Sequence, residues 1–487
     1  APLSLDEWSR IYPNLNGVFG LRAWLQPFGG CLQRLRVGLE GQTITPDSVS
    51  TLLEHCSRHF SQLVVHVHSE IPSPLLTECM ANSDRIFMLL QPATADLYNR
   101  DLLLREIRTH PKSEVFNLRT IICREKGEEH YNEVLKQLST PVHGFIHGCP
   151  HAVQGVELSG WDDSEFLGDI RRLAREVAHK RVGLALSSGG ARSLAHIGVI
   201  QILEENGIEI DVIAGCSMGS YIGAVWAFGY DGHTMERLAR EVEHRWGLLE
   251  LIDPFILPRQ GFLRGEKVKR RLKRSIGDAH FSELVRPLRI VATNLASLER
   301  TVFSTGEVAA AVHASSAIPG ACAPVKMGDE LYVDGGISDP LPVDVLQEMG
   351  IDKIIAVNTI PTPAYLRCRM EMDREQAELY GRHPGRVRKF VNQYLNYFAP
   401  GNILDIILRA FHGAQMRVAE HSCLAADLVL RPLSFDGRWH DFRHPAKYIA
   451  LGRQEAQEHL AEIKALIHRK EPKHESHFAH HALGALT

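Results

Sequence analysis

Residues 210–224 read IDVIAGCSMGSYIGA, and this stretch determines how we interpret the chain around it. Its apolar start predicts a buried strand and its small residues predict a helix, so that the two meet in a tight turn at Ser217. A serine on so sharp a turn is strained, and side chains at Gly215 or Gly219 would collide with the strand or the helix. The string fits a nucleophile elbow with Ser217 as nucleophile near a helix N-terminus. A plain strand–helix turn remains the alternative.

A second loop lies upstream, between a strand predicted over 181–186 and another predicted helix. Residues 187–192 read SSGGAR. Consecutive glycines at a strand end can turn backbone N–H groups outward together, which forms an anion-binding nest. Beside a nucleophilic serine, such a nest would hold the oxyanion of an acyl-transfer intermediate. A phosphate-binding loop is the weaker alternative, because the GxGxxG spacing is absent. The oxyanion-hole candidates are Ser188, Gly189, Gly190, Ala191 and Arg192.

A candidate base follows well downstream, where residues 331–336 read LYVDGG. Asp334 ends a short predicted strand. Gly335 and Gly336 then give the backbone after it a wider choice of conformations. Its carboxylate would accept the Ser217 proton directly, although an Asp-Gly β-turn is the ordinary alternative. The order along the chain is the more informative feature: nest first, then elbow, then Asp-Gly-Gly.

These three strings in this order resemble the patatin-like phospholipases, from residue 181 to about residue 360. Residues 314–320, ASSAIPG, resemble the segment that this family has between its elbow and its catalytic aspartate. The resemblance implies a three-layer α/β/α domain with a Ser217–Asp334 dyad and no catalytic histidine. It also implies a serine esterase that needs no metal or other cofactor.

A closer resemblance is to the neuropathy target esterase branch, whose members are lysophospholipases. It rests on residues 76–89, LTECMANSDRIFML, and on residues 169–175, DIRRLAR. One departure concerns the nest, because the family pattern Gly-Gly-Gly-x-Arg-Gly has glycines where this chain has Ser188 and Ser193. Serine resists positive φ, so we expect a tighter or shifted nest.

Histidines offer a different arrangement. His196 follows the nest, but its apolar neighbours at helical spacing favour a packed, hydrogen-bonded role. A conventional hydrolase triad needs a histidine after the acid. The first one is His383, with His412 and His440 further on.

The predicted function is hydrolysis of acyl esters of phospholipids or lysophospholipids through an acyl-enzyme. Two alternatives stay open: a catalytically weak lipid-binding or regulatory protein, and a conventional Ser-His-Asp esterase. Residues 261–274 predict a basic amphipathic helix that suits anionic headgroups, although a solvated basic face is the favoured interpretation.

Composition narrows the class of protein and its surroundings. The net charge of −4 over 487 residues indicates no nucleic-acid partner. Nine scattered cysteines without a CxxC pair indicate reduced thiols in a reducing compartment. The chain has no run of about 20 apolar residues, so we expect no membrane span. We therefore expect a cytoplasmic protein with peripheral contact to the inner membrane face, and the sequence does not indicate its oligomeric state.

The fold class is α/β, with two or three domains for a chain of this length. Short strand patterns, one of them over 62–67, alternate with helical patterns in the first third, which predicts a parallel Rossmann-like sheet. The predicted organisation is an α/β domain of unknown role over 1–158, a linker helix over 159–180, the patatin-like catalytic domain over 181–362, a mainly helical C-terminal region over 363–468 and a disordered tail over 469–487.

Overall fold

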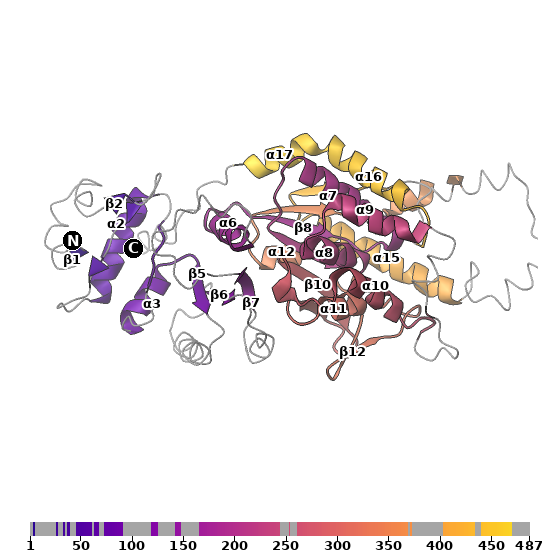
Figure 1. Ribbon diagram of the computed structural model, residues 1–487, viewed down its shortest axis with the longest axis horizontal. Coiled ribbons are helices and arrows are strands. Elements are labelled where there is room, and N and C mark those ends of the chain that lie inside the picture. Colours follow the sequence, from indigo (N-terminus) through magenta and orange to yellow (C-terminus); the bar gives the residue numbers. More distant parts are fainter. Residues whose placement is uncertain are drawn as a thin grey trace, which may run out of the picture. The chain divides into compact units, whose positions relative to one another are not determined.

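The computed structural model divides into two compact units, residues 1–153 with 471–487, and residues 154–470 (Figure 1). The residues it describes are 3–4, 26–27, 33–34, 37–38, 45–60, 63–67, 73–90, 118–124, 142–147, 165–243, 253, 261–368, 371–372, 403–433 and 440–469.

The first unit contains a parallel three-stranded sheet with strand order β5-β6-β7. Parallel pairing agrees with the α/β class predicted for this part of the chain. The prediction of a strand over 62–67 is wrong, because residues 63–67 form no strand and Val64 is exposed. The described elements are β1 (Leu3–Ser4), β2 (Gln26–Pro27), β3 (Gln33–Arg34), β4 (Val37–Gly38), α2 (Pro46–His59), α3 (Ser73–Ala81), β5 (Ile86–Leu90), β6 (Leu118–Arg124) and β7 (Val142–His147).

The second unit is built on one sheet with strand order β12-β13-β10-β9-β8-β14-β15 and β11 beside β10. Strands β10, β9, β8, β14 and β15 pair in parallel, whereas β11 and β13 pair antiparallel with β10. The strands are β8 (Val182–Leu186), β9 (Val212–Cys216), β10 (Leu288–Asn294), β11 (Arg300–Phe303), β12 (Val325–Met327), β13 (Glu330–Asp334), β14 (Lys353–Val357) and β15 (Leu428–Leu430).

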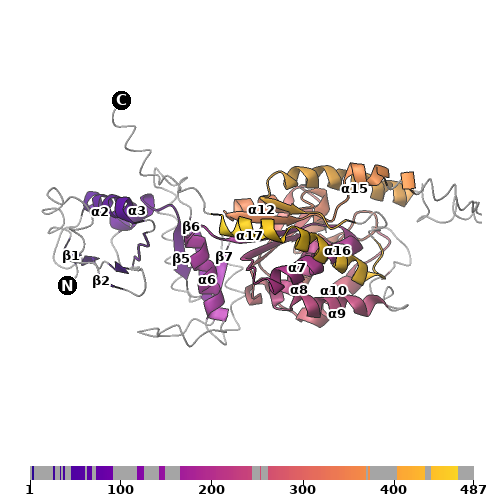
Figure 2. The same ribbon diagram turned by 90° about the horizontal axis from the view of Figure 1, so that it is seen from above.

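Helices cover both faces of this sheet (Figure 2). In β8, Leu184 and Leu186 pack into one buried apolar cluster, while Ala185 packs into another on the opposite face. Successive strand side chains point to opposite faces, so an all-apolar strand needs a helical layer on each side. The predicted three-layer α/β/α domain is therefore confirmed. One layer contains α7 (Ala195–Glu205), α8 (Met218–Phe228), α9 (Gly232–Arg240), α10 (Glu266–Ile276), α11 (Val308–Ser315), α16 (Pro445–Glu458) and α17 (Leu460–His468), and the other contains α12 (Val343–Glu348) and α15 (Ile403–Cys423).

The region predicted to be mainly helical, 363–468, contributes to this same unit. Its strand β15 extends the sheet beside β14, and its helix α16 packs on α7. The C-terminal region thus supplies both a strand and helices to the layers that surround the sheet. None of the helices in the described ranges is both long and apolar enough to cross a lipid bilayer.

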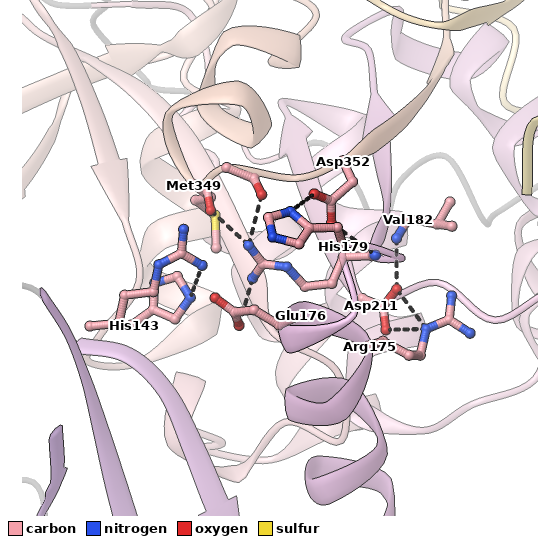
Figure 3. A network of polar contacts seen from close by, with 11 residues as sticks. His143, Arg175, Glu176, His179, Val182, Asp211, Met349 and Asp352 are labelled. Atoms are coloured by element: carbon pink, nitrogen blue, oxygen red, sulfur yellow. Dashed lines mark hydrogen bonds and ion pairs between the residues drawn. The ribbon is translucent and has the colours of Figure 1, made fainter. Parts of the chain in front are cut away.

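Helix α6 (Glu165–Val177) is tied to the edge of the sheet at which the parallel strands begin (Figure 3). Arg181, directly before β8, donates from Nη1 to Glu176 Oε2 at 2.9 Å, and both side chains are buried. Its Nη2 donates to the carbonyls of Met349 and Gly350, each at 2.9 Å. A buried ion pair needs such additional hydrogen bonds to offset the loss of hydration.

A second ion pair lies at the same edge. Arg175 contacts Asp211 at 3.0 Å, and Asp211 accepts from the backbone N–H of Val182 at 2.7 Å (Figure 3). Asp352 accepts from the Arg181 backbone N–H at 3.1 Å. This edge of the sheet is therefore occupied by structural contacts, and the opposite edge, where the parallel strands end, is left for the loops of the candidate site.

Candidate active site

Ser217 lies between the last residue of β9 and the first residue of α8, so the strand–turn–helix predicted around it is present. Its backbone has φ 51° and ψ −121°, a positive φ that a serine seldom adopts. A Cβ on Gly219 would collide with the carbonyl of Leu186, and one on Gly215 would meet the backbone of Ser220 at 2.8 Å. Glycine at both positions allows the turn to close.

Two hydroxyl groups hold this strained turn. The Ser217 backbone N–H donates to Ser315 Oγ at 2.8 Å, and Ser315 Oγ donates to Val291 O at 2.6 Å. Ser220 Oγ donates to Ser217 O at 2.5 Å. Ser315 is completely buried at the end of α11. It lies within the ASSAIPG segment, where its neighbours in the sequence do not mark it as a site residue.

Asp334 ends β13 and faces the elbow. Ser217 Oγ donates to Asp334 Oδ2 at 2.7 Å, and the Gly336 backbone N–H donates to Asp334 Oδ1 at 2.7 Å. Asp334 is 1% exposed, and burial raises its pKa to about 6, while the hydrogen bonds from Ser217 and Gly336 act in the opposite direction. The dyad partners are thus within hydrogen-bond distance, and the raised pKa makes the Asp334 carboxylate a stronger base than an exposed one.

The acid loop that follows is held close to β10. A Cβ on Gly335 would collide with the carbonyl of Val291. Thr293 Oγ1 donates to the Asp334 carbonyl at 3.1 Å, and the Asp334 N–H donates to the Ala317 carbonyl at 2.9 Å. The backbone on both sides of the carboxylate is therefore fixed by neighbouring segments.

The loop predicted to form the oxyanion hole follows β8 and continues into a short 3₁₀ helix, η5 (Gly190–Leu194). Gly190 has φ 60°, and within the described part of the chain the N–H groups of Gly189 and Gly190 donate to no protein acceptor. The Ser188 N–H instead donates to Pro340 O at 2.9 Å. Ala191 and Arg192 are buried within η5.

The two serines that replace glycines contact a hydroxyl cluster, Ser193 through its hydroxyl and Ser188 through its backbone carbonyl. Ser193 Oγ and Ser187 Oγ each lie 3.1 Å from Thr359 Oγ1, which also donates to Ser188 O at 3.1 Å. Neither Ser188 nor Ser193 has a positive φ. In this loop it is Gly190 that takes the left-handed conformation, so neither serine has to adopt a positive φ. The tighter or shifted nest stays a prediction.

His196 has the packed role that its sequence neighbours favoured. It is completely buried on α7, and its Nε2 lies 3.0 Å from the carbonyl of Ser187. A carbonyl only accepts, so Nε2–H donates. Burial lowers the pKa of His196 to about 4, which keeps the ring neutral. Among the described side chains, Asp334 is the group that Ser217 Oγ contacts, and His383 lies outside the described residues.

Comparison with known proteins finds one family model that matches the segment carrying this geometry. Residues 184–346 match the family model of the patatin-like phospholipases. The chain contains a patatin-like phospholipase domain. The resemblance seen in the sequence is thereby confirmed, and the domain's matched segment includes the oxyanion loop, the elbow and the acid loop.

Individual relatives match less than half of this chain. An uncharacterised NTE family protein of Mycobacterium tuberculosis is 42% identical over 184 residues, which is 38% of this chain and 50% of that protein. Lysophospholipase nte1 of Aspergillus fumigatus is 35% identical over 196 residues, 40% of this chain and 13% of that protein. The chain thus spans half or less of these relatives' lengths. Among solved structures, VipD from Legionella pneumophila matches 63% of this chain and 75% of its own at 15% identity, with a TM-score of 0.31.

The matched segment ends before several residues that contact the site of the patatin-like domain. Thr359, which organises the hydroxyl cluster, follows β14, and Gln415, which contacts Ser188, lies on α15. Both positions follow residue 346 in the chain. The family motifs could not indicate them, because such contacts form only when distant segments fold together.

Proposed function

We propose that the chain hydrolyses acyl esters of phospholipids or lysophospholipids through a Ser217–Asp334 dyad. The observation that carries this proposal is the 2.7 Å hydrogen bond from Ser217 Oγ to the buried carboxylate of Asp334. The patatin-like domain and the relative named lysophospholipase support the choice of a lipid ester as substrate.

The first half of the reaction forms an acyl-enzyme. Asp334 accepts the hydroxyl proton while Ser217 Oγ attacks the ester carbonyl carbon. The negative charge that develops on the carbonyl oxygen is stabilised by the N–H groups of Gly189 and Gly190, with the N-terminal end of α8 adding a favourable dipole. The intermediate then collapses, the alcohol portion of the lipid leaves, and it takes the proton from Asp334.

The second half regenerates the enzyme. Asp334 accepts a proton from water, whose oxygen attacks the acyl carbon bound to Ser217. Collapse of this second intermediate releases the fatty acid, and the proton on Asp334 returns to Ser217 Oγ. One carboxylate therefore acts as base and then as acid in each half.

We also propose that the substrate is taken from a membrane surface on the cytoplasmic side. Exposed Arg270 and Arg274 on α10 support this, because cationic side chains are attracted to anionic headgroups.

The test combines covalent labelling with lipid hydrolysis. A fluorophosphonate probe should label the wild type and Ser297→Ala, but it should not label Ser217→Ala. Ser297 is an exposed serine in the turn after β10 and serves as the matched control. Mass spectrometry of phospholipid and lysophospholipid vesicles should show released fatty acid under the same pattern. A folded wild type that neither labels nor hydrolyses would overturn the proposal in favour of a lipid-binding protein.

A further inference from the structure

Helix α15 contributes a polar side chain to the surroundings of the dyad. Gln415 is 4% exposed, and its Nε2 donates to Ser188 Oγ at 3.3 Å. Ser188 begins the oxyanion loop, and its own N–H donates to Pro340 O. The amide therefore contacts the loop from which the proposed oxyanion donors arise.

The same amide also lies against the acid loop. A Cβ on Gly336 would collide with Gln415 Nε2 and would lie 2.9 Å from Asp334 Oδ1. Gly336 is not among the glycines with a positive φ, so a larger residue there would be opposed by the side-chain contact and not by the backbone conformation, and the Gln415 amide would have to shift. Gly336 is the residue whose N–H donates to Asp334 Oδ1. Gln415 thus packs on the backbone that orients the base.

A buried amide is an unusual choice for a space-filling role. Taking a primary amide out of water costs free energy unless its polar atoms have partners, and an apolar side chain of the same size would fill the space more favourably. The neighbouring buried positions of α15 facing the sheet, Ala419 and Cys423, are apolar or nearly so. The buried hydroxyl of Ser422 donates to Val418 O of the same helix, whereas the Gln415 amide lies where α15 meets both loops.

We propose that Gln415 is a positioning residue of the site: its side-chain amide contacts the oxyanion loop through Ser188 and the acid loop through Gly336, and thereby holds the two loops at a fixed separation. The inference rests on the proposed hydrolysis by Ser217 and Asp334. Among the described contacts, the amide makes no hydrogen bond to Ser217 or Asp334. It acts through the N–H donors of one loop and the carboxylate orientation of the other.

The kinetic test compares Gln415 with a glutamine outside the site. Gln415→Ala and Gln415→Glu both remove the N–H donor, and the second keeps the side-chain shape. Each should lower kcat by about 10-fold to 100-fold and leave KM within about twofold, because misplacement of reacting groups affects the chemical step. Gln454→Ala on α16, where the exposed side chain bonds Glu458, should match the wild type. Wild-type kcat in both Gln415 variants would overturn the inference.

Hydrogen exchange provides a readout that needs no activity. In Gln415→Ala, peptides covering residues 186–194 and 334–340 should both exchange faster than in the wild type, whereas β9 and α7 peptides should not change. Gln454→Ala should change neither loop. Unchanged exchange over 334–340 in Gln415→Ala would overturn the inference. Because this measurement does not require esterase activity, it tests the role of Gln415 separately from the proposed hydrolysis.

A coupling test covers the case in which Gln415→Ala does not fold. Ser188→Ala removes only the hydroxyl partner of the amide, and it should still raise exchange over 334–340, since the amide then loses one of its two anchors.

In addition, Gly336→Ala should lower kcat more in the wild type than in a Gln415→Ser background, in which the colliding atom is gone. Strictly independent effects of the two substitutions would contradict the proposed contact.

Discussion

Burial raises the pKa of Asp334 from 3.8 to about 6, although hydrogen bonds from Ser217 and Gly336 lower it. A general base works best when its pKa lies just below the working pH, since it is then ionised and still basic enough to take a proton. The raised pKa therefore suits the proposed role of Asp334 and also has consequences for pH dependence and for stability.

Activity should depend on the ionisation of this carboxylate. We expect kcat/KM to rise with pH through about 6 and to level off above it, because the free enzyme must have Asp334 ionised. The measurement is a kcat/KM profile for a soluble ester, with circular dichroism showing that the protein stays folded at each pH. Asp334→Asn should lack measurable turnover at every pH. An acid limb near 4 would contradict a buried carboxylate as the base.

The same burial makes the ionised carboxylate unfavourable for folding. The pKa of Asp334 is higher in the folded protein than in the unfolded chain, so the folded protein binds the proton more tightly. The stability that this proton contributes is fully present below about pH 4 and is lost as the pH rises through 6. Asp334→Asn should therefore gain up to about 3 kcal/mol in free energy of unfolding over the wild type at pH 8, and little at pH 4. Urea unfolding at both pH values measures this. An equal difference at both would contradict the expectation.

At the scale of elements, α11 controls the geometry of the elbow through one hydroxyl. Ser315 accepts from the Ser217 N–H and donates to the Val291 carbonyl, so it joins the turn after β9 to β10. Without it, a buried N–H and a buried carbonyl lose their partners at a residue whose backbone is already strained. The elbow is thus held by an element that lies 98 residues further along the chain.

Ser315→Ala should lower both stability and reactivity. The expected loss is about 1–3 kcal/mol in free energy of unfolding. Labelling of Ser217 by the fluorophosphonate probe should slow at least about tenfold, because the nucleophile is no longer held in place. Ser316→Ala, at the adjacent half-buried serine, is the control and should change neither quantity much. Labelling at the wild-type rate in Ser315→Ala would show that the elbow needs no such support.

At the scale of the whole molecule, polar groups at the two edges of the sheet serve different purposes. The buried pair of Arg181 and Glu176 lies where the parallel strands begin, and the dyad lies where they end. The ion pair that holds α6 should contribute to the free energy of unfolding of this unit. It should not alter the distance between Ser217 and Asp334.

Glu176→Gln tests this separation. Removing one charge of a buried pair leaves the other less well compensated, and we expect a loss of about 3 kcal/mol or more in free energy of unfolding. The rate of Ser217 labelling at a temperature well below the unfolding transition should stay within about twofold of the wild type, because additivity holds for distant sites. A large fall in labelling rate in the folded variant would indicate that α6 and the dyad are coupled.

The local patterns of this protein could be predicted from the order of its residues. The apolar strands, the turn around Ser217 and the Asp-Gly-Gly string are encoded by residues a few positions apart, and steric rules for glycine act over such short distances. The three-layer domain and the family followed from these strings. Only the tertiary structure decided that Ser217 Oγ and Asp334 Oδ2 meet, that Ser315 and Thr359 hold the loops, and that Gln415 lies between them. These contacts join segments far apart in the chain, and a hydrogen bond depends on where the sheet brings two atoms and not on the neighbours of either residue.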